Sequence, residues 1–127
     1  MHKYLTITAI LGATAVILGA FGSHALKELL TEQALASYQV AVRYQMYHVL
    51  LLLFINISNY LTDNQKKLLN ILLIIGVVFF SGSIYTIQLL GVSSNSIWFI
   101  TPLGGVLLIG SWLLLAFYFL KKVSKKT

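Results

Sequence analysis

The chain has 127 residues, of which 58% are hydrophobic and only 9% charged, and its mean hydropathy is +0.87. Because soluble domains carry about 25% charged residues, this composition excludes an ordinary soluble protein and indicates a single-domain integral membrane protein. The absence of cysteine excludes disulfides, thiolate metal sites and cysteine nucleophiles, and the formal charge of +6 gathers at the edges of apolar runs, as expected for membrane surfaces and not for nucleic acid.

Four apolar runs are long enough to cross a bilayer as helices, which takes about 20 residues each. They predict an all-α, four-helix membrane bundle with spans at about residues 4–22, 38–60, 68–90 and 101–120. The first run has a second interpretation as a secretory signal peptide cleaved near Gly22. Its length exceeds the roughly 7 to 15 apolar residues of a signal peptide, so a retained first span is favoured.

Small residues recur along the first span at steps of three and four, which is the pattern of closely packed membrane helices. This small-residue seam consists of Thr8, Gly12, Ala15, Gly19 and Gly22. It fits packing within the bundle or between copies of the chain, and packing within the bundle is favoured. The same packing role is predicted for glycines in the third and fourth spans, namely Gly82, Gly104 and Gly105.

The segment 23–37 between the first two spans predicts a short external amphipathic helix, which Ser23 would cap. Within it His24, Glu28 and Glu32 are spaced to share one helical face. Such a face is either solvated or able to present imidazole and carboxylates to a divalent metal. Because no recognised zinc spacing is present, the solvated face is favoured, and we predict no metal site and no cofactor.

The second span carries polar residues on one side. With about 100° of rotation per residue, these side chains fall within an arc of about 80°: Tyr38, Gln45, His48, Asn56 and Asn59. A polar stripe is unfavourable against lipid, so it should face the bundle interior. It would either supply hydrogen bonds between helices, the favoured interpretation, or line a polar pathway in which His48 titrates.

The basic residues predict the orientation of the spans by the positive-inside rule. With four spans, one side of the membrane holds Lys3, Lys66, Lys67, Lys121, Lys122, Lys125 and Lys126, and the other only Lys27 and Arg43. Both termini are therefore expected in the cytoplasm. Arg43 lies inside the second span, where it would snorkel to the interface or pair with Glu28 or Glu32.

Four stretches of the chain resemble one family. They are GAFGSHAL from Gly19, YQVAVRYQMYH from Tyr38, FSGSIY from Phe80 and ITPLGG from Ile100. Together they are similar to the family of domain of unknown function 423, whose eukaryotic relatives are known as transmembrane protein 256. The resemblance implies a small polytopic membrane protein that keeps its first segment and has no established activity, cofactor or catalytic residue.

The four stretches all lie in the predicted outer half of the membrane, so we expect their polar side chains to converge. The predicted polar cluster comprises His24, Gln45, His48, Ser81, Ser83, Tyr85 and Thr101. The favoured role is an accessory or structural envelope component that contacts membrane lipids and a second copy or another membrane protein. The alternatives are a small transporter or proton-coupled permease using His48, and a lipid- or metal-dependent enzyme.

Overall fold

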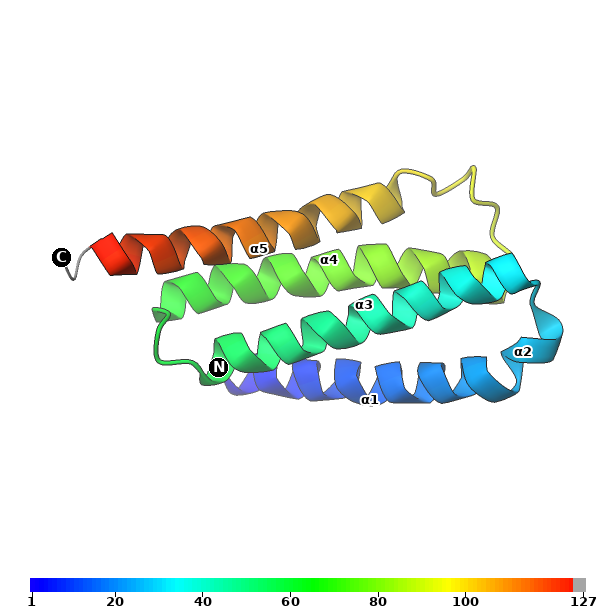
Figure 1. The fold of residues 1–127 in the computed structure, drawn as a ribbon, viewed down its shortest axis with the longest axis horizontal. Coiled ribbons are helices and arrows are strands. Elements are labelled where there is room, and N and C mark those ends of the chain that lie inside the picture. The colour runs from blue at the N-terminus through cyan, green and yellow to red at the C-terminus, as the bar shows by residue number, and fades with distance from the viewer. Residues whose placement is uncertain (125–127) are drawn as a thin grey trace.

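The computed structural model describes residues 1–124 as a set of five helices. They are α1 (His2–His24), α2 (Leu26–Leu29), α3 (Glu32–Ile57), α4 (Asp63–Leu90) and α5 (Ile100–Ser124). The four long helices are each long and apolar enough to cross a membrane. They run side by side, with the first residue, the α3–α4 turn and the end of α5 at one end (Figure 1). The predicted all-α membrane bundle is confirmed.

The helix ends are fixed by residues suited to them. Before α4, the Thr62 hydroxyl accepts from the Gln65 amide at 3.3 Å, and the Gln65 side chain accepts from the Thr62 amide at 3.0 Å. This reciprocal capping box satisfies two donors that the first helical turn leaves free. At its other end α4 stops at Gly91, whose φ of 65° is readily adopted only by glycine.

The segment between α1 and α3 differs from its prediction. The external helix is only the four-residue α2, because α1 continues to His24 and α3 already begins at Glu32. Ser23 does not cap a helix; its hydroxyl donates to the Gly19 carbonyl inside α1 at 3.2 Å. The cap is Thr31, which is extended and accepts from the Ala34 amide at 3.2 Å, so the residues predicted as the second half of the external helix form the first turns of α3.

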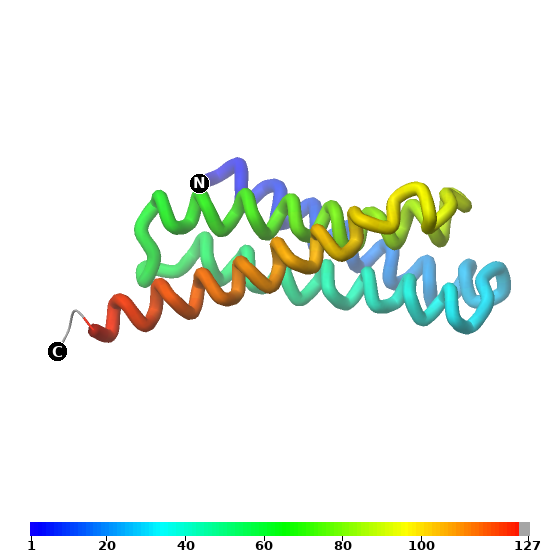
Figure 2. The backbone as a smooth tube through the Cα atoms, turned by 90° about the horizontal axis from the view of Figure 1, so that it is seen from above, coloured from blue at the N-terminus to red at the C-terminus, as the bar shows by residue number. Residues whose placement is uncertain are grey.

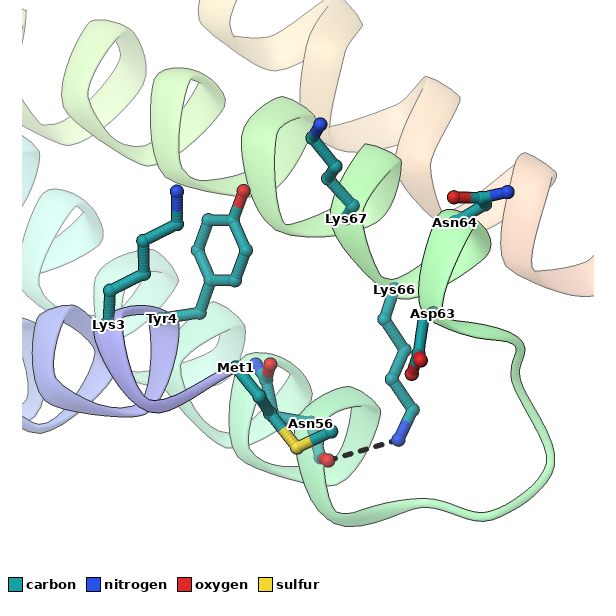
Figure 3. A pocket seen from close by; sticks show the side chains of 8 residues that line it. All are labelled: Met1, Lys3, Tyr4, Asn56, Asp63, Asn64, Lys66 and Lys67. Atoms are coloured by element: carbon teal, nitrogen blue, oxygen red, sulfur yellow. Dashed lines mark hydrogen bonds between the residues drawn. The ribbon is translucent and has the colours of Figure 1, made fainter.

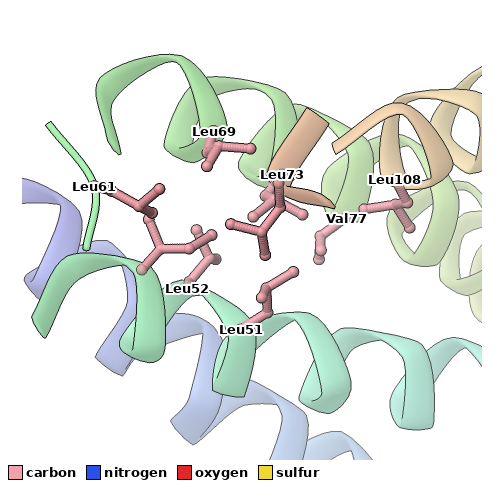
Figure 4. Packing of buried hydrophobic residues seen from close by; sticks show 9 residues of the cluster. Leu51, Leu52, Leu61, Leu69, Leu73, Val77 and Leu108 are labelled. Atoms are coloured by element: carbon pink, nitrogen blue, oxygen red, sulfur yellow. The ribbon is translucent and has the colours of Figure 1, made fainter. Parts of the chain in front are cut away.

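Each long helix packs mainly against its neighbour in the chain, α1 on α3, α3 on α4 and α4 on α5. Seen from above, α5 crosses the other helices at an angle (Figure 2). Leucine, isoleucine and valine from α3, α4, α5 and the α3–α4 turn form the apolar core (Figure 4). Its members are Leu51, Leu52, Ile55, Leu61, Leu69, Leu73, Val77, Leu108 and Leu115.

The small-residue seam of α1 lies against α3. A Cβ atom added to Gly12 or Gly19 would stand 3.3 Å from a valine methyl of α3. At Gly22 it would stand only 2.5 Å from the ring of Tyr38, so no side chain fits there. Within one chain, the seam therefore allows the backbone of α1 to approach α3.

The glycines of the third and fourth spans differ from one another. A Cβ on Gly104 would lie 2.9 Å from the Gly76 carbonyl oxygen and even closer to the Phe80 amide nitrogen, both backbone atoms of α4. On Gly105 it would meet only the Phe80 ring, at 3.8 Å. Gly82 does not pack against another helix: its added Cβ would meet only Val78 of α4 itself, at 4.0 Å. The packing role predicted for Gly82 is therefore wrong, because this position turns away from the neighbouring helices.

Candidate functional site

One face of α3 carries the polar stripe into the protein interior. Tyr38, Gln45, His48 and Asn56 are each at most 4% exposed. Asn59 is the exception, because α3 ends at Ile57 and Asn59 is exposed in the turn that follows. The stripe predicted from helical spacing thus faces the bundle over the length of α3.

Gln45 connects three helices through its side-chain amide. Its nitrogen donates to the Leu11 carbonyl oxygen at 2.8 Å and to the Thr14 hydroxyl at 3.0 Å, both on α1. Its oxygen accepts from the Tyr85 hydroxyl of α4 at 2.7 Å. Both amide protons and the carbonyl oxygen therefore have partners, which makes Gln45 a junction between α1, α3 and α4.

Two further hydrogen bonds join α3 to its neighbours near Gln45. The buried Tyr38 hydroxyl donates to the Leu18 carbonyl of α1, and its ring lies 5.5 Å from that of Tyr85. On the other side, the Ser81 hydroxyl of α4 donates to the Ala41 carbonyl of α3 at 2.7 Å. The N-terminal half of α3 is thus hydrogen-bonded to α1 and to α4.

The imidazole of His48 is engaged on both nitrogens. Nδ1 lies 2.6 Å from the Tyr44 carbonyl oxygen, and Nε2 lies 3.2 Å from the indole nitrogen of Trp112 on α5. An indole N–H can only donate, so Nε2 is the acceptor and the proton sits on Nδ1. Trp112 was not among the predicted site residues, because its apolar helical setting resembles that of a lipid-facing tryptophan, and 48% of it is indeed exposed.

The remaining predicted residues are placed separately. Ser83 of α4 lies 2.5 Å from the Thr101 hydroxyl oxygen in the first turn of α5 and also donates to the Phe80 carbonyl at 2.9 Å. His24 is exposed at the end of α1 and makes no hydrogen bond to the others within residues 1–124. The predicted residues therefore do not form one cluster. They form separate hydrogen bonds between neighbouring helices, and His24 takes part in none of them.

A second polar group, which the predicted site did not include, occupies the opposite end of the bundle. The amides of Asn56 on α3 and Asn70 on α4 donate to each other at 2.8 and 3.1 Å. Lys66, only 8% exposed, donates to the Asn56 carbonyl oxygen at 3.2 Å. The signal was present in the sequence, since Lys66 and Asn70 follow the helical spacing of the buried Leu73 and Val77.

Each of these groups has at least one hydrogen-bond partner within the protein. Over residues 1–124, no buried side-chain nitrogen or oxygen lacks a hydrogen bond. In a bilayer, where water is absent, such mutual satisfaction is what holds polar helices together.

The charged residues near the α1–α3 connection do not form the metal-binding face or the ion pair considered from the sequence. His24, Glu28 and Glu32 fall on three successive helices and not on one face, and within residues 1–124 no group of three or more His, Asp or Glu side chains is placed to hold a metal ion. Arg43 is exposed, and it forms no ion pair with Glu28 or Glu32 in this part of the chain. Glu32 lies eleven residues away on α3, about 16 Å along the axis at 1.5 Å per residue.

Comparison with known proteins agrees with the resemblance drawn from the sequence. The profile of the family described as "Protein of unknown function (DUF423)" matches residues 18–105. A UPF0382 membrane protein of Haemophilus influenzae is 38% identical over 117 residues, covering 91% of this chain and 92% of that protein. A UPF0382 membrane protein of Staphylococcus saprophyticus is 41% identical over 115 residues, covering 91% of this chain and 94% of its own.

A more distant relative is the UPF0382 inner membrane protein YgdD of Escherichia coli. It is 32% identical over 118 residues, which cover 87% of this chain and 84% of that protein. No solved structure matches the chain significantly.

Proposed function

This chain belongs to the family described as "Protein of unknown function (DUF423)", and we propose that it is a structural or accessory component of the cell membrane with both termini in the cytoplasm. It is a multi-pass integral membrane protein. In the proposed role its helices form a stable unit that associates with lipids and with a second copy or another membrane protein.

The observation that supports this role is that the polar side chains of the interior are hydrogen-bonded within the protein. A proton or solute pathway needs groups that can exchange partners. The Gln45 amide is instead held by α1 and α4, and the ring nitrogens of His48 are held by Tyr44 of its own helix and by Trp112 of α5. Protonating His48 would place an N–H on Nε2 facing the N–H of Trp112, where two donors would meet. This geometry favours helix linkage over transport.

The proposed orientation is supported by the clustering of lysines at one end of the bundle. Lys3, Lys66 and Lys67 lie at the end where α1 begins and α3 turns into α4. Because positively charged loops are retained in the cytoplasm, this end would face inward. The relative named as an inner membrane protein fits that location.

Orientation can be measured because the chain has no cysteine of its own. We expect Asn95→Cys, in the α4–α5 loop, to react with a membrane-impermeant maleimide in intact cells. Asn59→Cys, in the α3–α4 turn, should react only after the membrane is opened. The reverse pattern would refute the proposed orientation.

The absence of a transport role can be tested with reconstituted protein. Liposomes loaded with a pH-sensitive dye and given a pH gradient should show the same proton leak with and without the protein. A leak that depends on the protein and is abolished by His48→Ala, but kept in Thr86→Ala, would overturn the structural assignment. Thr86 is a suitable control because its hydroxyl donates only to the Gly82 carbonyl oxygen of its own helix, at 2.7 Å.

The accessory role predicts reproducible neighbours. Photo-crosslinking in native membranes, from a probe placed at the exposed Leu113 of α5, should yield one defined product containing a second copy or another membrane protein. A probe at Leu29 of α2, also exposed, controls for random collision. Equal, diffuse products from both positions would contradict the proposal.

A further inference from the structure

A pocket of about 370 Å³ opens at the lysine-rich end of the bundle, between the start of α1, the end of α3 and the start of α4. Its volume lies in the range of small-molecule sites, roughly 300 to 1,000 Å³. Figure 3 shows Lys3 and Tyr4 of α1 projecting toward α4 on one side, with Lys66 running across to Asn56 on the other. The remaining lining residues are Met1, Asp63, Asn64 and Lys67.

The pocket carries an excess of positive charge. Three lysines, Lys3, Lys66 and Lys67, line it against a single carboxylate, Asp63. It also adjoins the first turn of the long helix α4, which is the positive end of the helix dipole. All these features favour an anion.

The ammonium group of Lys66 is buried beside the pocket with only part of its hydrogen-bonding capacity used. Its side chain is only 8% exposed, and within residues 1–124 its ammonium makes one hydrogen bond, to the Asn56 carbonyl oxygen at 3.2 Å. An ammonium has three donors, and burying a charge without a counter-ion is unfavourable. Two of its donors and its charge are therefore left for a group inside the pocket.

We propose that this pocket binds an anionic phosphate group through the ammonium of Lys66, with Lys3 and Lys67 adding positive charge at its rim. The pocket lies at the end of the membrane-spanning helices, where phospholipid headgroups lie, so an anionic phospholipid is the source closest at hand. In the proposed orientation it faces the cytoplasmic leaflet, which carries anionic lipid. The site is separate from the interior links on which the proposed structural role rests, so either can fail without the other.

The test uses purified, delipidated full-length protein in a neutral detergent. Its unfolding temperature is measured while phosphatidylglycerol, phosphatidylcholine or inorganic phosphate is added, because a ligand of the native state stabilises in proportion to its occupancy. We expect saturable stabilisation by phosphatidylglycerol at concentrations where phosphatidylcholine has little effect. Equal stabilisation by inorganic phosphate would keep the phosphate site and assign it to a soluble ligand.

Variants locate the site. Each lysine removed should raise the half-saturating concentration about fivefold, since a lysine near an anionic surface contributes about 1 kcal/mol. Lys66→Met tests the buried group. Lys3→Gln combined with Lys67→Gln, both exposed positions, should weaken binding about 25-fold by the same reasoning and serves if Lys66→Met does not fold.

The matched control is Lys121→Gln, which removes the same charge at the same end of the bundle but outside this pocket. It should leave the half-saturating concentration unchanged. The proposal is overturned if the two lipids stabilise equally, if the pocket variants bind as the parent does, or if Lys121→Gln weakens binding as much as they do.

Discussion

Adding one methyl group to Gly104 should separate α5 from α4, whereas the same change at the next residue should not. The Cβ of Gly104→Ala would stand 2.9 Å from the Gly76 carbonyl oxygen and closer still to the Phe80 amide nitrogen. These are backbone atoms in a helix and cannot turn aside as a side chain can. The Cβ of Gly105→Ala would meet the Phe80 ring at 3.8 Å, an ordinary contact.

The two changes therefore share one chemical alteration and differ only in the space available. Alanine is favoured over glycine within a helix by about 0.5–1 kcal/mol, and this term is common to both variants. Overpacking typically destabilises by about 1–3 kcal/mol, sometimes more. We expect Gly104→Ala to be less stable than Gly105→Ala by about 1–3 kcal/mol, which is roughly 5- to 150-fold in the folding equilibrium.

The measurement is equilibrium unfolding in mixed micelles with increasing denaturing detergent, followed by Trp112 fluorescence in a Trp98→Phe background. Trp112 reports on α5, because its indole bonds to His48 across the α3–α5 contact. Gly105→Ala is the control for glycine replacement in the same helix. Equal midpoints for the two variants, or a higher midpoint for Gly104→Ala, would refute the close approach of α4 and α5.

Three other predictions concern the contacts of α3 and can use the same unfolding measurement. Gln45→Leu should lower the free energy of unfolding by about 1–2 kcal/mol. Tyr85→Phe should lower it by less, because Tyr85 supplies only one of the three hydrogen bonds of Gln45. A greater loss in Tyr85→Phe would contradict this order. A double-mutant cycle of Asn56→Leu and Asn70→Leu should give a coupling of at least about 0.6 kcal/mol, and additive effects would mean that the amides do not interact. Gly22→Ala should destabilise by about 1–3 kcal/mol, because its methyl would stand 2.5 Å from a fully buried tyrosine ring; an unchanged midpoint would contradict that contact.

Features that repeat along one helix could be predicted from the sequence. The four spans, the polar stripe of α3 and the small-residue seam of α1 all follow from spacing and length. The structure has these features, although α3 begins and ends earlier than the predicted second span and so leaves Asn59 outside the helix. The helix boundaries were less predictable. The four-residue α2 depends on Thr31 capping α3, and composition alone did not distinguish that cap from the one expected at Ser23.

Which polar groups bond across helices could not be predicted, because helical spacing gives the direction of a side chain but not the rotation of its neighbour. The predicted cluster includes Gln45 and Tyr85, which are hydrogen-bonded to each other, but it does not include Trp112, the partner of His48. In the sequence Lys66 indicates only the orientation of the spans, because a lysine beside a turn is usually solvated. Its burial depends on the end of α3, which the α4 sequence does not reveal.

The junction at Gln45 also bears on how the chain assembles during synthesis. Helices enter the membrane in chain order, and the amide nitrogen of Gln45 finds both its acceptors on α1, which is already present. Its oxygen has no donor until Tyr85, near the end of α4, arrives. A nascent chain stopped before α4 thus leaves the side-chain oxygens of Gln45 and Asn56 without their donors, and completion of α4 supplies both.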